Sequence, residues 1–197
     1  MNRLILISGG IGAGKSVVCR ILTSMGYAVY DCDNRAKQLI DRDRSLSIRI
    51  DEALRRYAAE PLIDSGCALR RDALAAVVFG NPAALKILNS IVHPAVLHDL
   101  EQWREKQNTV CFVESAIPSE SRLRDYVDEE WIVEAPERLR ISRVVQRNGL
   151  APEKVSQRIA AQQSEWLLPN AVAHHIVNDN RTSLLLQIDE LLRHTDL

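Results

Sequence analysis

Short apolar runs alternate along this chain with stretches of helical periodicity. The first run, Leu4–Ile7, leads through Ser8 directly into glycine. An unbroken apolar run predicts a strand that is buried on both faces, as in a parallel sheet, because a strand with one solvated face alternates apolar and polar residues. Strands of the same kind are predicted over residues 27–30, 110–113 and 131–133, and a weaker one at 176–177.

Helical spacing fills the segments between these runs. Residues 16–25 have apolar side chains on one helical face, and the stretch from about Ser45 to Lys106 has no strand pattern and predicts a helical insertion. From Glu137 to about Trp166 the helical pattern contains Asn148-Gly149 and then Pro152, a stop and restart that predicts a helical hairpin. This alternation predicts an α/β fold with a parallel sheet flanked by helices, in one compact domain.

Composition narrows the class of protein. A chain of 197 residues that is 46% hydrophobic can bury a core without disulfides or metals, and its net charge of −1 gives no general attraction to nucleic acid or anionic lipid. The four cysteines contain no C-x-x-C pair, so we expect free thiols in a reducing compartment. No apolar run approaches the roughly 18 residues of a membrane span. We therefore expect a cytoplasmic protein that binds neither nucleic acid nor membrane.

One motif carries specific chemistry. Gly9–Ser16 satisfies G-x-x-x-x-G-K-[ST] between a predicted buried strand and a predicted helix, which is the context of a phosphate-binding loop. Its backbone N–H groups would surround the phosphates of a nucleoside triphosphate, Lys15 would bridge the β- and γ-phosphates, and Ser16 would hold Mg²⁺. The predicted ATP-binding residues of the loop are Gly10, Ile11, Gly12, Ala13, Gly14, Lys15, Ser16 and Val17. The alternative is a glycine-rich turn that binds nothing.

A phosphate loop does not by itself identify the reaction. The guanine-reading string N-K-x-D and the switch string D-x-x-G of GTPases are both missing from the chain. A mechanical ATPase usually has a strand that ends in a metal-binding Asp, whereas the corresponding apolar run here ends at Glu114. A small-molecule kinase remains, and it requires a base, an acceptor pocket and cations over the transferred phosphoryl group.

Asp33 is the candidate base. Asp31-Cys32-Asp33 follows the second predicted strand, at the sheet edge where open parallel sheets bind ligands. A carboxylate there can accept the proton of an attacking hydroxyl. The alternative is that Asp31 caps the next helix and that Asp33 only faces water.

Arginines and histidines supply the other candidates. Arg140, Arg143 and Arg147 would share one helical face and could cover a triphosphate, although such stripes are often only solvated surface. His93-Pro94 interrupts a helical pattern and predicts a turn with the imidazole near a pocket, while a lone histidine usually has a structural role. His174-His175 has no other ligand at metal spacing, so we assign it no metal.

Together these motifs resemble the dephospho-CoA kinase family over about residues 4–180. The loop is similar to the family's G-G-I-G-x-G-K-S, and Asp31-Cys32-Asp33 is similar to its D-x-D. The most discriminating likeness is to its acceptor-binding helices: Arg71, Leu74, Phe79, Asn81-Pro82, Leu88 and His93-Pro94. Arg143 and Arg147 match the R-x-x-x-R of its lid, whereas Pro118-Ser119 and Leu168 depart from the family pattern.

The resemblance implies a P-loop kinase fold with a helical acceptor region over about 45–106 and a lid over about 137–168. The nucleotide-binding core would then cover about 1–44, 107–136 and 170–197. The implied catalytic residues are Asp33, Lys15 and Arg143; Arg147 and Asn178, with Gln162, would lie on the ATP side; Asp33, Arg71, His93, Pro94 and Glu120 would bind the acceptor.

The implied reaction moves the γ-phosphoryl group of ATP, with Mg²⁺, to the ribose 3'-hydroxyl of dephospho-CoA, the last step of coenzyme A synthesis. Two other functions stay open at this point. One is a kinase of another small nucleoside-like acceptor, and the other is a regulatory ATP-binding protein that has lost turnover.

Overall fold

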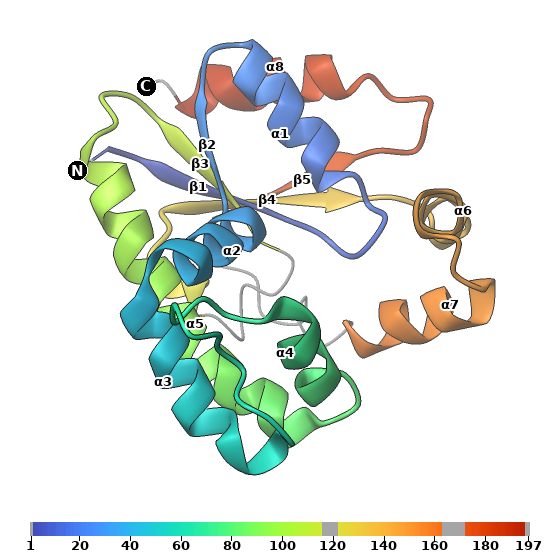
Figure 1. The fold of residues 1–197 in the computed structure, drawn as a ribbon. Helices are drawn as coiled ribbons and strands as arrows, with labels where there is room; N and C mark the ends of the chain where they lie inside the picture. Colours follow the sequence, from blue (N-terminus) through green and yellow to red (C-terminus); the bar gives the residue numbers. More distant parts are fainter. Residues whose placement is uncertain (1, 116–121, 163–171, 196–197) are drawn as a thin grey trace. The chain divides into compact units, whose positions relative to one another are not determined.

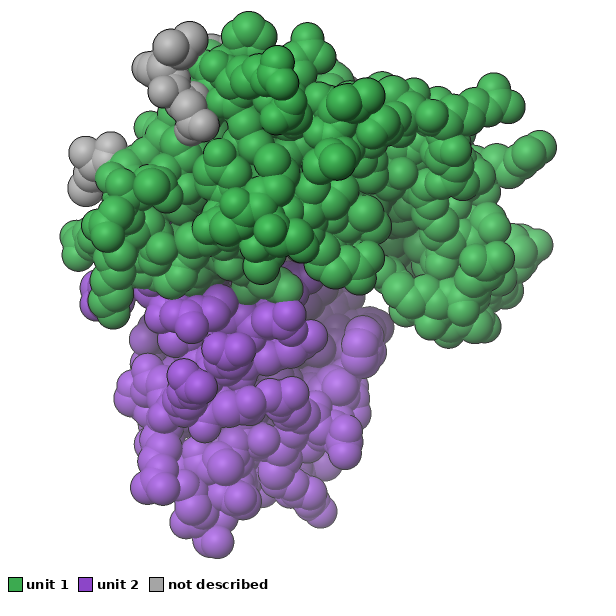
Figure 2. All heavy atoms as spheres, turned by 90° about the horizontal axis from the view of Figure 1, so that it is seen from above, with its two compact units in different colours: residues 1–31, 103–197 green, residues 32–102 purple. Residues whose placement is uncertain are grey.

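The computed structural model describes residues 2–115, 122–162 and 172–195. The chain divides into two compact units, which Figure 2 colours separately. We call residues 1–31 with 103–197 the sheet unit and residues 32–102 the helical unit. The helical unit begins earlier than the insertion that helical spacing predicts, because the first helix after the second strand already belongs to it.

The sheet unit contains a five-stranded parallel sheet with the order β2-β3-β1-β4-β5 (Figure 1). The central strand β1 is buried along its whole length, which explains its unbroken apolar sequence. All five predicted strands are confirmed: β1 (Leu4–Ser8), β2 (Ala28–Asp31), β3 (Cys111–Glu114), β4 (Glu129–Glu134) and β5 (Ala173–Val177).

Helices α1 (Lys15–Ser24) and α8 (Leu184–Thr195) cover one face of this sheet (Figure 1). Their side chains form one apolar core with the strands: Val18, Leu22, Ile188 and Leu192 pack with Ile5, Ile7, Phe112, Trp131 and Ile176. Residues one position along the strands, such as Leu6 and Ile132, point to the opposite face.

The predicted helical hairpin is confirmed as α6 (Glu137–Asn148) and α7 (Pro152–Ala161). Gly149 adopts φ 65° at the end of α6, where its N–H donates to the carbonyl oxygen of Val145, and Pro152 begins α7. Asn148-Gly149 and Pro152 therefore act as the stop and restart that their residue types predict.

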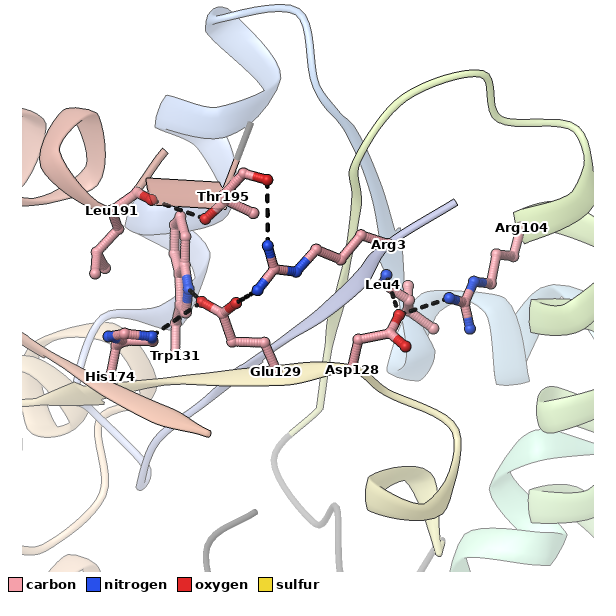
Figure 3. A network of polar contacts seen from close by, with 9 residues as sticks. All are labelled: Arg3, Leu4, Arg104, Asp128, Glu129, Trp131, His174, Leu191 and Thr195. Atoms are coloured by element: carbon pink, nitrogen blue, oxygen red, sulfur yellow. Dashed lines mark hydrogen bonds and ion pairs between the residues drawn. The ribbon is translucent and has the colours of Figure 1, made fainter. Parts of the chain in front are cut away.

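Strand β4 begins two residues before its apolar run, with two buried glutamates, Glu129 and Glu130, of which Figure 3 shows Glu129. Glu129 Oε2 lies 2.5 Å from Arg3 Nη2, and Glu129 Oε1 accepts a hydrogen bond of 2.6 Å from Trp131 Nε1. Glu130 pairs with the half-buried Arg124, with a shortest distance of 2.9 Å between Arg124 Nε and Glu130 Oε2. A pattern of apolar residues misses these two positions because their burial depends on ion pairs and hydrogen bonds with particular partners.

The helical unit contains α2 (Cys32–Arg42), α3 (Arg44–Leu54), a short 3₁₀ helix at Arg55–Tyr57, α4 (Arg71–Val78) and most of α5 (Pro82–Glu105). A second 3₁₀ helix, Leu123–Asp125, belongs to the sheet unit. The buried Asp51 of α3 accepts a hydrogen bond of 2.6 Å from the backbone N–H of Leu62 and pairs with Arg55. None of the described helices is both long enough and apolar enough to cross a membrane.

The predicted turn at His93-Pro94 is wrong. Helix α5 continues through Pro94, although proline removes one backbone hydrogen bond from a helix interior. Val92, Val96 and Leu100 are buried along one side of α5 on both sides of the proline, while Pro94 itself is exposed. Their burial offsets the cost of the lost hydrogen bond.

Candidate active site

The phosphate loop joins the carboxyl end of β1 to α1, as its motif predicts. Two of its glycines are required by their conformation, since Gly12 has φ 77° and Gly14 has φ 106°. A Cβ atom at Gly14 would lie 2.1 Å from Asn178 Nδ2, and one at Gly12 would lie 2.6 Å from the carbonyl oxygen of Arg140. No side chain fits at either position, so the loop backbone packs directly against its neighbours.

The backbone N–H groups of this loop fall into two sets. Ala13 N–H donates to the carbonyl oxygen of Gly10 at 3.0 Å, and Ile11 N–H donates to Gln162 Oε1 at 2.8 Å. For the N–H groups of Gly12, Gly14 and Ser16, the described residues supply no acceptor. Because Gly14 also caps the N-terminus of α1, these unsatisfied donors and the positive end of the helix dipole suit a phosphate group.

Lys15 and Ser16 add the charge and the hydroxyl that the motif predicts. Lys15 Nζ donates to the carbonyl oxygen of Gly9 at 2.8 Å, so its side chain folds back along the loop. The Ser16 side chain is exposed, and its hydroxyl makes no hydrogen bond to the part of the chain that is described. This hydroxyl is therefore open to a metal ligand role, and Mg²⁺ typically takes few protein ligands and keeps water and substrate phosphates.

Arg143 of α6 and Asn178 after β5 hold the outer side of the loop. Arg143 Nη1 lies 3.3 Å from the carbonyl oxygens of both Gly12 and Ala13, and Asn178 Nδ2 donates to Ala13 at 2.8 Å. Arg143 Nη2 also donates to Asn178 O at 3.1 Å and to Asn180 Oδ1 at 2.6 Å. The contact of Asn180 was not predicted, because nothing in the sequence shows that the segment after β5 turns back to the lid.

The three arginines of the predicted stripe, Arg140, Arg143 and Arg147, do not all lie at the phosphate loop. Arg140 also reaches the loop, since its Nε donates to the carbonyl oxygen of Ile11 at 2.9 Å. Its Nη2 atom is buried and has no hydrogen-bond partner among the described residues, and desolvation lowers the pKa of Arg140. Arg147 is exposed and donates to Asn148 Oδ1. The structure therefore brings Arg140 and Arg143 to the loop and leaves Arg147 on the surface.

Carboxylates line the sheet edge next to the loop. Asp31 at the end of β2 and Glu114 at the end of β3 are partners in the sheet register. Burial and the adjacent Glu114 raise the pKa of the Cys19 thiol, so the thiol stays protonated and hydrogen-bonds to Glu114. Among the described residues, no three His, Cys, Asp or Glu side chains form a metal-binding cluster.

A cavity of about 490 Å³ lies beside the loop in the sheet unit. Gly9, Gly10 and Arg140 line one part of it, and Glu134, His175 and Val177 line another. His175 Nδ1 lies 2.9 Å from Glu134 Oε1, and both side chains are exposed. His175 thus pairs with the carboxylate of Glu134.

Four of the predicted acceptor-side residues, Asp33, Arg71, His93 and Pro94, belong to the helical unit. Asp33 is exposed and lies in the first turn of α2, two residues after Asp31 at the end of β2. Arg71 begins α4 and pairs with Asp41 at the end of α2, with 3.2 Å between Arg71 Nε and Asp41 Oδ1; this hydrogen bond lowers the pKa of Asp41. His93 is half-buried in α5. Glu120, Pro118-Ser119 and Leu168 lie outside the described residues.

One ion pair fixes the helix that carries Asp33. Arg35 of α2 binds Asp99 of α5 through three hydrogen bonds, 2.9 Å from Nε to Oδ2, 2.7 Å from Nη2 to Oδ2 and 3.0 Å from Nη2 to Oδ1. Such a two-point contact holds planar groups in a fixed orientation. This ion pair thus links the two helices that carry Asp33 and His93 within the helical unit.

Comparison with known proteins agrees with this geometry. A family model described as dephospho-CoA kinase matches residues 3–184. A dephospho-CoA kinase of Porphyromonas gingivalis is 41% identical over 91% of this chain and 87% of its own, and one of Bacteroides fragilis is 33% identical over 94% and 89%. The crystal structure of TT1252 from Thermus thermophilus has a TM-score of 0.74 at 30% identity, over 98% of this chain and 96% of that one. The chain belongs to the dephospho-CoA kinase family.

Proposed function

We propose that this protein is a dephospho-CoA kinase, which transfers the γ-phosphoryl group of ATP to the ribose 3'-hydroxyl of dephospho-CoA and releases CoA and ADP. The observation that carries the proposal is the phosphate loop, whose N–H groups at Gly12, Gly14 and Ser16 lack an acceptor within the described chain. The family match supports dephospho-CoA as the acceptor.

On the nucleotide side, the loop and its charges bind and orient ATP. The unsatisfied N–H groups bind the phosphate oxygens, and Lys15 moves from the carbonyl oxygen of Gly9 to the β- and γ-phosphates. Arg143 and Arg147 close from the lid and offset the charge that develops on the transferred phosphoryl group, and Asn178 lies on the ATP side. Ser16 would hold Mg²⁺, which supplies further charge neutralisation when bound.

On the acceptor side, Asp33 takes the proton of the 3'-hydroxyl of dephospho-CoA. The hydroxyl oxygen forms a bond to the γ-phosphorus of ATP, while the bond from that phosphorus to the β–γ bridging oxygen breaks and ADP leaves. Arg71, His93, Pro94 and Glu120 bind dephospho-CoA. The exposure of Asp33 in the first turn of α2 and the Arg35–Asp99 contact that links α2 to α5 support this role. In this proposal residues 45–106 form the acceptor region and residues 137–168 the lid. The four cysteines form no disulfide with one another, which supports a cytoplasmic site of action.

Comparison of acceptors tests this function. Purified protein with Mg-ATP is offered dephospho-CoA, adenosine or AMP, and ADP release is followed together with product mass. We expect ADP release to depend on dephospho-CoA and to accompany one phosphoryl group added to it. Faster transfer to adenosine or AMP would instead identify a kinase of another acceptor, and ATP binding without any transfer would identify a regulatory protein.

A further inference from the structure

A single residue of the phosphate loop, Ile11, is held from three sides by the helical hairpin and the residue that follows it. Its side chain packs against Val144, Val155 and Ile159, the buried cluster between α6 and α7. Its carbonyl oxygen accepts from Arg140 Nε at 2.9 Å, and its N–H donates to Gln162 Oε1 at 2.8 Å. We call Arg140, Gln162 and this apolar cluster the Ile11 clamp.

The planar geometry of peptide bonds turns these outer contacts into orientations on the inner side of the loop. In a trans peptide the C=O of one residue and the N–H of the next point in opposite directions. When Arg140 binds the carbonyl of Ile11, the N–H of Gly12 therefore points away from α6. That N–H is one of those without an acceptor among the described residues, so Arg140 orients a donor that ATP can use.

Gln162 acts on the preceding peptide in the same way. Because it binds the N–H of Ile11, the carbonyl of Gly10 points in the opposite direction, where it accepts from Ala13 N–H at 3.0 Å. This bond closes the turn of the loop. Neither Arg140 nor Gln162 has to contact ATP to have this effect.

The position of Arg140 costs stability, which argues against a purely structural role. Its guanidinium lies against Gly10, where a Cβ atom would be 2.2 Å from Nη2, and this Nη2 is buried with no described partner. A buried donor without an acceptor destabilises a folded protein. A residue that served only folding would gain little from this arrangement.

We infer that the α6–α7 hairpin sets the shape of the phosphate loop through the Ile11 clamp, and that Arg140 and Gln162 are positioning residues for ATP. The loop and the hairpin then behave as one element, so a hairpin displaced from Ile11 leaves Gly12 N–H misdirected. This inference uses the proposed function only in taking ATP as the ligand of the loop. ATP affinity can be measured without any acceptor, so the two proposals fail separately.

Arg140→Met and Arg140→Gln form a matched pair of variants. The amide nitrogen of Gln stands the same number of bonds from Cα as Arg Nε, and the terminal methyl of Met occupies that place without a donor. By calorimetry we expect Arg140→Met to raise the Kd of Mg-ATP about three- to tenfold, the effect of one hydrogen bond, and Arg140→Gln to stay within about twofold of wild type. The melting temperature of the ligand-free protein should change by less than about 4 °C.

Gln162→Leu tests the clamp from the other side of Ile11 and carries the test alone if Arg140→Met does not fold. It should raise the Kd of Mg-ATP by a similar factor. Because both variants release the same residue, the double variant should bind ATP about as weakly as the single variant that has the larger effect.

Three results would overturn the inference. One is ATP affinity that is unchanged in both single variants. Another is an equal loss of ATP affinity in Arg140→Met and Arg140→Gln, which would mean that the positive charge of Arg140 acts on the phosphates directly. The third is multiplication of the two single effects in the double variant, because independent contacts multiply.

Discussion

The two ends of the same parallel sheet treat their polar groups in opposite ways. At the amino end, Glu129 is satisfied by Arg3 and Trp131, and Arg3 also donates to the carbonyl of Thr195 at the end of α8 (Figure 3). Asp128 accepts from the N–H of Leu4 and from Arg104. At the carboxyl end, the N–H groups of Gly12, Gly14 and Ser16 have no acceptor in the described chain.

Buried polar atoms without partners follow the same division. Among the side-chain atoms of the described residues, only Ser8 Oγ and Arg140 Nη2 are of this kind, and both lie at the carboxyl end of the sheet. Unsatisfied buried donors destabilise the fold unless a ligand satisfies them. We infer that the amino end holds strands and terminal helix together, while the carboxyl end gives up stability to bind phosphate.

The largest effect on function is expected from removing Lys15, the cation of the phosphate loop at the carboxyl end of the sheet. Lys15→Ala should lower kcat on the order of 100-fold or more, because the charge at the β- and γ-phosphates is lost in the transition state. Steady-state assays with saturating dephospho-CoA would measure it. The unfolding free energy should change little, and a wild-type kcat would refute the role of Lys15.

A smaller effect is expected from adding one methyl group to the loop. Gly14→Ala would place Cβ 2.1 Å from Asn178 Nδ2 at φ 106°, and we expect the Kd of ATP to rise about tenfold or more. Gly26→Ala is the matched control, since Gly26 also has a positive φ of 94° but nothing lies within 4 Å of its Cβ position. Gly26→Ala should cost stability by about 1–2 kcal/mol and leave ATP affinity unchanged. Equal effects of the two variants on ATP affinity would contradict the role of the Gly14–Asn178 contact.

The smallest effect on function is expected at the amino end. Glu129→Leu leaves the buried Trp131 Nε1 without its acceptor and should lower the free energy of unfolding by about 1–3 kcal/mol. Asp189→Asn is the control, because its ion pair with Arg193 is exposed and should contribute less than about 1 kcal/mol. Denaturant unfolding gives both values. If Glu129→Leu weakened ATP binding in the folded protein, the proposed division between the two ends would be wrong.

The sequence predicts features of this fold whose cause is local. Glycine, lysine and serine between an apolar run and a helix specify the phosphate loop, and Asn148-Gly149 with Pro152 specifies the hairpin. Interruption of α5 at Pro94 was predicted wrongly, because the burial of Val92 and Val96 outweighs a local preference. The contacts of Arg140 and Asn180 could not be predicted, since they depend on where the loop passes in space.

The central claim is that Asp33 starts transfer of the γ-phosphoryl group to dephospho-CoA. The most direct measurement compares CoA formation by the wild type and Asp33→Asn with Mg-ATP, by mass spectrometry, with the Kd of ATP measured in parallel. We predict that the wild type forms CoA and that Asp33→Asn lowers kcat on the order of 100-fold or more, while its ATP affinity stays within a few-fold. Undiminished CoA formation by Asp33→Asn, or none by the wild type, would contradict the account.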